Sequence, residues 1–243
     1  MTDDVIKTGD GAILYDTEIL NQISPAAFTP SAWASASVIQ GELRSGGRGN
    51  TLLVSDGDNE FVLRHYRRGG LPGKVVRDLY VWTGEDATRS FREWRMLFKL
   101  YRKGLPVPRP VAARYQRRGL VYTADLLTLR VPGIRSLADR IIERPGSREF
   151  WRGIGRGIHR FHAAGACHAD LNAYNVQVAA GGSVFLLDFD RGEMREPGVW
   201  RQKNIARLHR SLRKIRAMDK RVNFGNAQWN ELLEGYFSES RSA

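Results

Sequence analysis

The feature that most constrains this chain is a set of polar residues placed around one short apolar strand. An eight-residue segment, His168-Ala-Asp-Leu-Asn-Ala-Tyr-Asn175, follows a predicted amphipathic helix that ends at Gly165. A glycine turn and the apolar run Val184–Leu187 come next, and the run ends in Asp188-Phe-Asp190. Carboxylate and amide oxygens are ligands that Mg²⁺ prefers, and a further carboxylate can act as a general base. Asp and Asn are also common turn residues, so it is their joint occurrence that indicates a site.

This arrangement resembles the catalytic loop of protein-kinase-like enzymes, H-x-D-L-x-x-x-N, followed by their D-F-G segment. The resemblance implies transfer of the γ-phosphate of ATP to a hydroxyl group, with Asp170 as the base that orients and deprotonates the acceptor. It also implies that Asn175 and Asp188 hold Mg²⁺ on the phosphates. His168 is expected to bond backbone near the metal ligand rather than to carry a proton.

The N-terminal half is then expected to hold ATP. The segment Gly46-Gly47-Arg48-Gly49 lies between two predicted strands, where its backbone amides would cover the phosphates. Arg64 stands on the next strand where this superfamily usually carries lysine, and Glu93 on the following helix is its natural partner. Because arginine is bulkier and forks its hydrogen bonds, Lys74 is kept as an alternative cation. A chance glycine hairpin and a solvated strand charge are the competing interpretations of the loop and of Arg64.

Two departures from the protein-kinase pattern bear on the acceptor. Asp190 stands where D-F-G has glycine, and no A-P-E motif follows it. Only 55 residues follow Asp188, whereas protein kinases use a much larger region to seat a peptide. A compact acceptor is therefore expected.

The periodicity of apolar residues predicts strands with one helix first and mostly helices afterwards. The first half is predicted to contain an irregular lead-in at 1–30, strands at 37–40, 51–55, 60–66 and 119–124, and a helix at 86–103. The second half is predicted to contain a short helix from 136, a helix at 147–164, strands at 176–178 and 184–187, and a basic helix at 200–221. Ser147 is predicted to cap the helix at 147–164, and its apolar residues are predicted to lie along one face. This order predicts an α+β, two-lobed protein-kinase-like fold, with a β-rich N-terminal lobe over 1–126 and a compact, mostly helical C-terminal lobe over 127–243.

Four segments together resemble a narrower family. They are V-L-R-H-Y-R-R-G-G at 62–70, G-L-P-V-P-R-P at 104–110, the loop at 168–175 and L-D-F-D at 187–190. Over roughly 35–225 the chain is similar to the 3-deoxy-D-manno-octulosonic acid (Kdo) kinases of the lipopolysaccharide kinase family of Gram-negative bacteria. The resemblance implies ATP-dependent phosphorylation of the Kdo 4-hydroxyl on Kdo-lipid A, at the inner face of the inner membrane.

The charge of the chain agrees with an anionic partner. The net charge is +12, and nine Lys or Arg against the single acid Asp219 lie between Arg201 and Arg221. We expect this basic helix to face the phosphates of an anionic membrane surface, with a solvated helix face as the alternative. Nucleic acid is not expected as a partner, because a nucleic-acid-binding module leaves the catalytic loop without purpose.

Other features of the sequence concern location. The single cysteine, Cys167, excludes an internal disulfide and fits a reducing compartment. No apolar run approaches the roughly 20 residues of a membrane span, and the first residues lack the order of a secretory signal. These features predict a peripheral protein on the cytoplasmic face of the inner membrane.

Three other functions compete with this interpretation. An antibiotic phosphotransferase of the same superfamily is a poor match, because those enzymes use acidic residues for polycationic acceptors. A heptose kinase or another small-molecule kinase is the closer alternative. A lipid-binding pseudokinase scaffold is favoured by the departures from the kinase pattern at Arg64 and Asp190. The intact trio Asp170, Asn175 and Asp188 argues against it, because a scaffold does not require catalytic residues.

Overall fold

The computed structural model describes residues 2–38, 51–67 and 78–238. Contacts divide the described chain into two compact units. The N-terminal unit ends at Val131, and the C-terminal unit takes residues 103–107 together with the residues from Pro132 onward. The predicted boundary at 126/127 lies a few residues before this division. No helix among the described residues is both long and apolar enough to cross a membrane.

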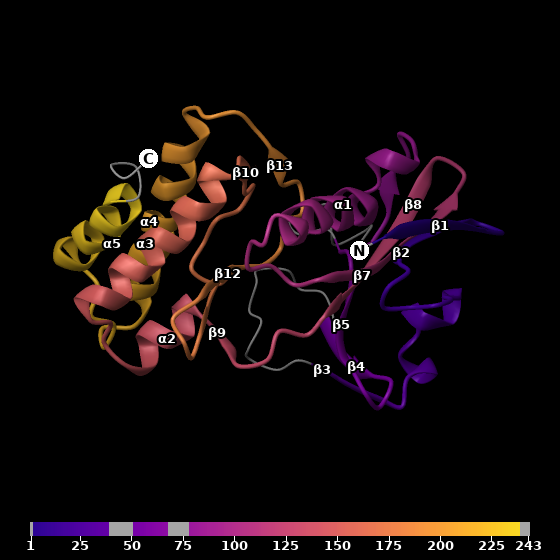
Figure 1. The fold of residues 1–243 in the computed structure, drawn as a ribbon, viewed down its shortest axis with the longest axis horizontal. Helices are drawn as coiled ribbons and strands as arrows, with labels where there is room; N and C mark the ends of the chain where they lie inside the picture. Colours follow the sequence, from indigo (N-terminus) through magenta and orange to yellow (C-terminus); the bar gives the residue numbers. More distant parts are fainter. Residues whose placement is uncertain (1, 39–50, 68–77, 239–243) are drawn as a thin grey trace. The chain divides into compact units, whose positions relative to one another are not determined.

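An antiparallel sheet forms the N-terminal unit (Figure 1). Across the sheet the strands follow the order β1 (Asp3–Thr8), β2 (Gly11–Asp16), β7 (Pro110–Arg118), β8 (Val121–Leu129), β5 (Glu60–His65), β4 (Thr51–Ser55) and β3 (Ser35–Val38). The short β6 (Tyr80–Val81) pairs with β8. The helix α1 (Arg89–Arg102) packs on β7 and β8. A second apolar cluster, which includes Ile13, Phe28 and Phe61, is built on β2, β5 and the 3₁₀ segment at Pro25–Phe28.

Two parts of this sheet were not predicted as strands. The lead-in at 1–30 contains the β1–β2 hairpin, and β7 begins at Pro110, the last proline of the segment 104–110. The residues from Ala12 to Asp16 in β2 are all buried, because β2 is paired on both edges and covered on both faces. A strand in that position has no alternation of apolar and polar residues, so its sequence gives no period-two signal.

The C-terminal unit is mostly helical (Figure 1). Its helices are α2 (Leu137–Glu143), α3 (Arg148–Ala163), α4 (Trp200–Met218) and α5 (Asn226–Ser238). Its strands are β9 (Ile134–Ser136), β11 (Val176–Ala179) and β12 (Val184–Leu186) in one sheet and β10 (Ala166–Cys167) with β13 (Glu193–Met194) in another. The predicted cap of α3 is confirmed, since Ser147 Oγ accepts a hydrogen bond from the Phe150 backbone N–H at 3.1 Å.

The two helices α3 and α5 touch through glycine. A Cβ atom added to Gly155 would lie 2.0 Å from the Leu232 carbonyl oxygen, and one added to Gly235 would lie 2.1 Å from the Arg152 carbonyl oxygen. Only hydrogen fits at either position, so the backbones of the two helices come into direct contact. The helix α5 was not predicted, because part of its buried face is Gly235 rather than an apolar side chain.

Candidate active site

His168 fixes the loop between β10 and β11 through two hydrogen bonds of its ring. The ring is buried, its Nδ1 accepts a hydrogen bond from the Asp170 backbone N–H at 3.0 Å, and its Nε2 lies 2.9 Å from the Leu187 carbonyl oxygen. With Nδ1 accepting, Nε2 carries the proton and donates it to that carbonyl. Burial lowers the pKa of His168, which keeps the ring neutral in this role. The histidine therefore joins the start of the loop to the end of β12.

Two asparagine side chains stabilise the rest of the loop through hydrogen bonds to its backbone. Asn172 Oδ1 accepts hydrogen bonds from the backbone N–H groups of Tyr174 and Asn175, at 2.8 and 3.1 Å. Asn175 Nδ2 donates to the Asp170 carbonyl oxygen at 2.9 Å. Asn175 is only 1% exposed, and its Oδ1 has no hydrogen-bond partner among the described residues. A fixed, buried acceptor oxygen without a partner is costly unless a ligand uses it.

Asp188 comes directly after β12. The Leu187 backbone N–H donates to the Asn175 carbonyl oxygen at 3.0 Å, so the chain at Asp188 runs beside the end of the loop. Phe189 is fully buried, and its ring centroid lies 4.8 Å from that of His168. Asp188 has a left-handed backbone with φ 62°, which aspartate tolerates better than most residues.

The missing glycine of the D-F-G pattern has a local explanation. The described residues other than glycine that have positive φ are Asp188 and Arg191, at 62° and 60°. Asp190 therefore does not need the backbone freedom that glycine would supply, and this departure causes no strain at that position.

The donor set around Asn175 and Asp188 fits a magnesium ion. Both could supply hard oxygen atoms, and Asn175 Oδ1 is buried without a hydrogen-bond partner among the described residues, so it could accept such an ion. No group of three His, Cys, Asp or Glu side chains that could hold a metal occurs within 2–38, 51–67 and 78–238.

Asp170 is the accessible carboxylate of the loop. Its side chain is 52% exposed, and its two oxygens accept separate hydrogen bonds. Asn172 Nδ2 donates to Oδ2 at 3.1 Å, and Arg207 Nη1 donates to Oδ1 at 3.1 Å. Arg207 was predicted only as one of the cations that face a membrane surface, and its contact with Asp170 was not predicted.

The helix α4 is fastened to the loop by two polar side chains. Asn204 Oδ1 accepts from the His168 backbone N–H at 3.2 Å, and its Nδ2 donates to the His168 carbonyl oxygen at 3.0 Å. Ser211 Oγ accepts from the Ala173 backbone N–H at 3.1 Å. Positions 204, 207 and 211 share one face of a helix. Arg207 therefore lies on the same face as Asn204 and Ser211, between the two residues that bind the loop.

The N-terminal unit contains the pair expected to clamp phosphate. Arg64 on β5 forms an ion pair with Glu93 on α1, and Glu93 is only 2% exposed. Tyr66 Oη donates to Glu93 Oε2 at 2.6 Å and lies 3.1 Å from Arg64 Nη2. Burial, followed by the charge of Glu93, raises the pKa of Tyr66 well above its usual value, so the phenol stays protonated. The segment Gly46-Gly47-Arg48-Gly49 and Lys74 lie outside the described residues.

Comparisons with known proteins cover most of the chain. Residues 31–236 match the model of the lipopolysaccharide kinase (Kdo/WaaP) family. A 3-deoxy-D-manno-octulosonic acid kinase of Stenotrophomonas maltophilia (strain K279a) is 48% identical over 209 residues, which are 86% of this chain and 82% of that protein. The kinase with the same name from Xanthomonas campestris pv. campestris (strain B100) has the same identity and coverage. The solved structure titled "WaaP in complex with acyl carrier protein" has a TM-score of 0.60 at 16% identity and covers 93% of this chain and 88% of that one, so the two share a fold.

Proposed function

The chain belongs to the lipopolysaccharide kinase (Kdo/WaaP) family and is a kinase, and from this premise we propose that it transfers the γ-phosphate of ATP to the 4-hydroxyl of Kdo on Kdo-lipid A. One observation carries the proposal for this chain. The loop from His168 to Asn175 presents an accessible carboxylate and, five positions later, a buried amide oxygen without a partner. A base for a hydroxyl group and a ligand for a phosphate-bound metal are the two parts that phosphoryl transfer requires.

Each residue of the site has a separate proposed role in phosphoryl transfer. Asp170 orients the acceptor hydroxyl and takes its proton, while Asn172 and Arg207 hold the carboxylate in place. Asn175 and Asp188 would hold Mg²⁺, which when bound neutralises negative charge on the transferring phosphate. His168 fixes the loop that carries these residues and takes no part in proton transfer.

The nucleotide is proposed to use residues of the N-terminal unit. Arg64 would contact the phosphates, and Glu93 would hold the guanidinium in position. Gly46-Gly47-Arg48-Gly49 is proposed to cover the phosphates with backbone amides, and Lys74 stays the alternative to Arg64 as the cation.

The proposed location is the cytoplasmic face of the inner membrane. The acceptor class that the family acts on is part of a glycolipid, so a peripheral enzyme must approach a surface that bears phosphates. Exposed cations of α4 such as Arg213 and Lys214 are proposed to bind that anionic surface.

Mass spectrometry of Kdo-lipid A after incubation with ATP and Mg²⁺ tests the activity. The expected product gains one phosphate, and NMR of the isolated product places it on the 4-hydroxyl. Asp170→Asn and Asp188→Asn each keep the shape of the side chain, and each is expected to lower turnover at least about 100-fold at an unchanged melting temperature.

Other outcomes favour the alternatives. Phosphorylation of a heptose-containing acceptor but not of Kdo-lipid A would identify a heptose kinase. Binding of the lipid with no turnover of ATP would identify a scaffold. A folded Asp170→Asn variant with a near-normal rate would overturn the assignment of the base.

A further inference from the structure

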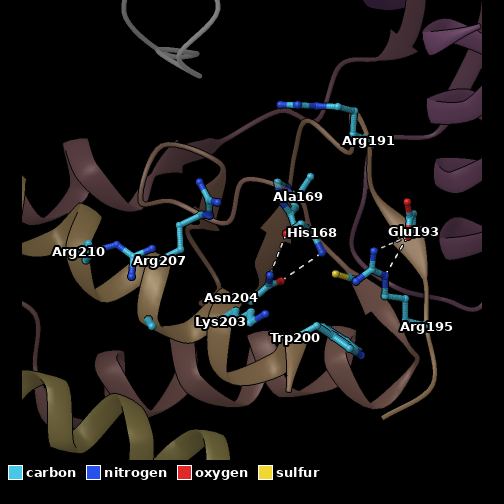
Figure 2. A pocket seen from close by; sticks show the side chains of 12 residues that line it. His168, Ala169, Arg191, Glu193, Arg195, Trp200, Lys203, Asn204, Arg207 and Arg210 are labelled. Atoms are coloured by element: carbon cyan, nitrogen blue, oxygen red, sulfur yellow. Dashed lines mark hydrogen bonds and ion pairs between the residues drawn. The ribbon is translucent and has the colours of Figure 1, made fainter. Parts of the chain in front are cut away.

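A cavity of about 400 Å³ opens beside the catalytic loop, entirely within the C-terminal unit (Figure 2). Its wall includes His168 and Ala169 of the loop and Asn204 of α4. The charged residues of its wall are Arg191, Glu193, Arg195, Lys203, Arg207 and Arg210. Five cations and one carboxylate therefore share a cavity the size of a small ligand.

The cations come from two different segments. Lys203, Arg207 and Arg210 lie on α4 at steps of four and three, which places them along one face of the helix. Arg191 and Arg195 come from the segment around β13 that follows Asp188-Phe-Asp190. In Figure 2 the side chains of Arg207 and Arg210 lie at the left of the view, that of Arg195 at the right and that of Arg191 at the top.

Most of this positive charge is not compensated within the wall. Glu193 Oε2 accepts from Arg195 Nη2 at 2.7 Å and so balances one of the five cations. Arg207 reaches Asp170, which belongs to the proposed catalytic machinery rather than to the wall of the cavity. Like charges gathered in a concave site repel one another, and an anion that enters the cavity relieves the repulsion.

We propose that this cavity binds an anionic group of the acceptor, a carboxylate or a phosphate ester, and thereby places the acceptor hydroxyl at Asp170. The inference rests on the proposed function and names the part of the site that recognises the substrate. Guanidinium groups present paired donors that match both kinds of anion. Arg207 makes the link, since it lines the cavity and its Nη1 lies 3.1 Å from Asp170 Oδ1.

The shape of the site separates this role from general attraction to a membrane. On a flat basic surface, each cation near the lipid adds a similar attraction to the membrane. A cavity instead selects one group of limited size, and the cations that line it should affect the acceptor more than other cations of the same unit do. This difference makes the proposal testable.

The test compares Lys203→Ala and Arg210→Ala with Arg160→Ala, an exposed arginine on α3 that does not line the cavity. Each cavity variant is expected to raise the KM for Kdo-lipid A about tenfold, the loss of one charge-assisted hydrogen bond. The KM for ATP and the melting temperature should stay at the values of the unchanged protein. Arg210→Lys should restore part of the affinity, and Arg160→Ala should behave as the unchanged protein.

Modified acceptors identify the anion. If the cavity holds the sugar carboxylate, the penalty of Arg210→Ala disappears on carboxyl-reduced Kdo-lipid A. If it holds a lipid phosphate, the penalty disappears on the dephosphorylated lipid. An unchanged acceptor KM in both cavity variants would overturn the proposal, and so would a rise in the KM for ATP, because the cavity would then hold a nucleotide phosphate.

A binding measurement keeps this inference separate from the proposed function. Kdo-lipid A, which carries both the sugar carboxylate and the lipid phosphates, is titrated in detergent micelles into the unchanged protein and into Arg210→Ala by calorimetry. If the protein binds Kdo-lipid A with dependence on Arg210 but does not phosphorylate it, the cavity is correct and the reaction is wrong. If it phosphorylates the lipid while both cavity variants act normally, the reaction is correct and the cavity is wrong. If the protein neither phosphorylates nor binds Kdo-lipid A, both are wrong.

Discussion

Replacement of Arg64 by alanine removes the cation that faces a nearly buried carboxylate. Glu93 is 2% exposed and accepts hydrogen bonds from both Arg64 and Tyr66. After the change, the carboxylate keeps the hydrogen bond from the tyrosine hydroxyl, at 2.6 Å, but loses the charge of the guanidinium. Two effects are expected, because the pair supports the N-terminal unit and is also proposed to position a cation for the phosphates of ATP.

The magnitude follows from the burial of the two partners. Loss of one partner of a buried ion pair costs about 3–5 kcal/mol. The Arg64 side chain is 21% exposed, so water partly replaces it, and the lower end of the range, about 3 kcal/mol, applies. At this chain length such a loss corresponds to a fall of roughly 6–12 °C in melting temperature. Arg64→Lys keeps the positive charge but loses the paired N–H donors of the guanidinium, so a smaller fall in melting temperature is expected.

The assay combines calorimetry with kinetics at varied ATP concentrations. Arg64→Ala should raise the KM for ATP, and Arg64→Lys should recover part of the loss. Arg118→Ala removes an exposed arginine from the same sheet and should change neither quantity. Lys74→Ala serves as the competing variant for the phosphate clamp.

Two results would refute this reasoning. An unchanged melting temperature in Arg64→Ala would show that Glu93 does not depend on the guanidinium. A normal KM for ATP in that variant, together with a severe defect in Lys74→Ala, would show that the clamp has been assigned to the wrong cation.

Three further predictions concern the C-terminal unit. Gly155→Ala should strongly lower the melting temperature because its methyl group meets a carbonyl oxygen at 2.0 Å, whereas Gly153→Ala on the same helix meets nothing within 3.9 Å and should raise it slightly. Burial lowers the pKa of His162 to about 4, so the unfolded chain binds a proton at this residue before the folded chain does as the pH falls. His162 should therefore account for about 2 kcal/mol of the stability lost between pH 7.5 and pH 5, and denaturant titrations of His162→Gln should show a loss that is smaller by about this amount. Reversal of Arg213 and Lys214 to Glu should weaken co-sedimentation with anionic vesicles, more at low salt than at high salt, while activity on a soluble acceptor survives; unchanged binding would mean a solvated face.

The sequence was informative where a local pattern determines the structure. The cap at Ser147 and the buried stripe of α3 depend on neighbours three and four positions away, and both were predicted correctly. The loop from His168 to Asn175 could be located because several of its hydrogen bonds connect residues only two to five positions apart. Such contacts leave a pattern of residue types that can be recognised in the sequence alone.

Features that depend on distant residues could not be predicted. Arg207 and Asp170 are 37 positions apart, and one arginine among nine cations carries no sign that it alone reaches a carboxylate. Asn204 lies within the predicted helix at 200–221, but the sequence carries no sign that its side chain contacts His168, 36 positions earlier. The strand β2 shows no alternation of apolar and polar residues, because it is buried on both faces. In each case the missing information is the identity of the neighbour across space.

The glycine contact between α3 and α5 has a consequence for folding during synthesis of the chain, because α3 is made well before the helix that covers it. The large sheet is complete once Leu129 has been made, so the N-terminal unit can fold early. The face of α3 that meets α5 stays uncovered until roughly 60 further residues have been added, which takes about 3–12 s at about 5–20 residues per second. Trp151 and Phe161 of α3, both buried in the finished protein, are exposed for at least part of this interval. The nascent chain is then most open to aggregation, and a chaperone would find its apolar surface in the C-terminal unit.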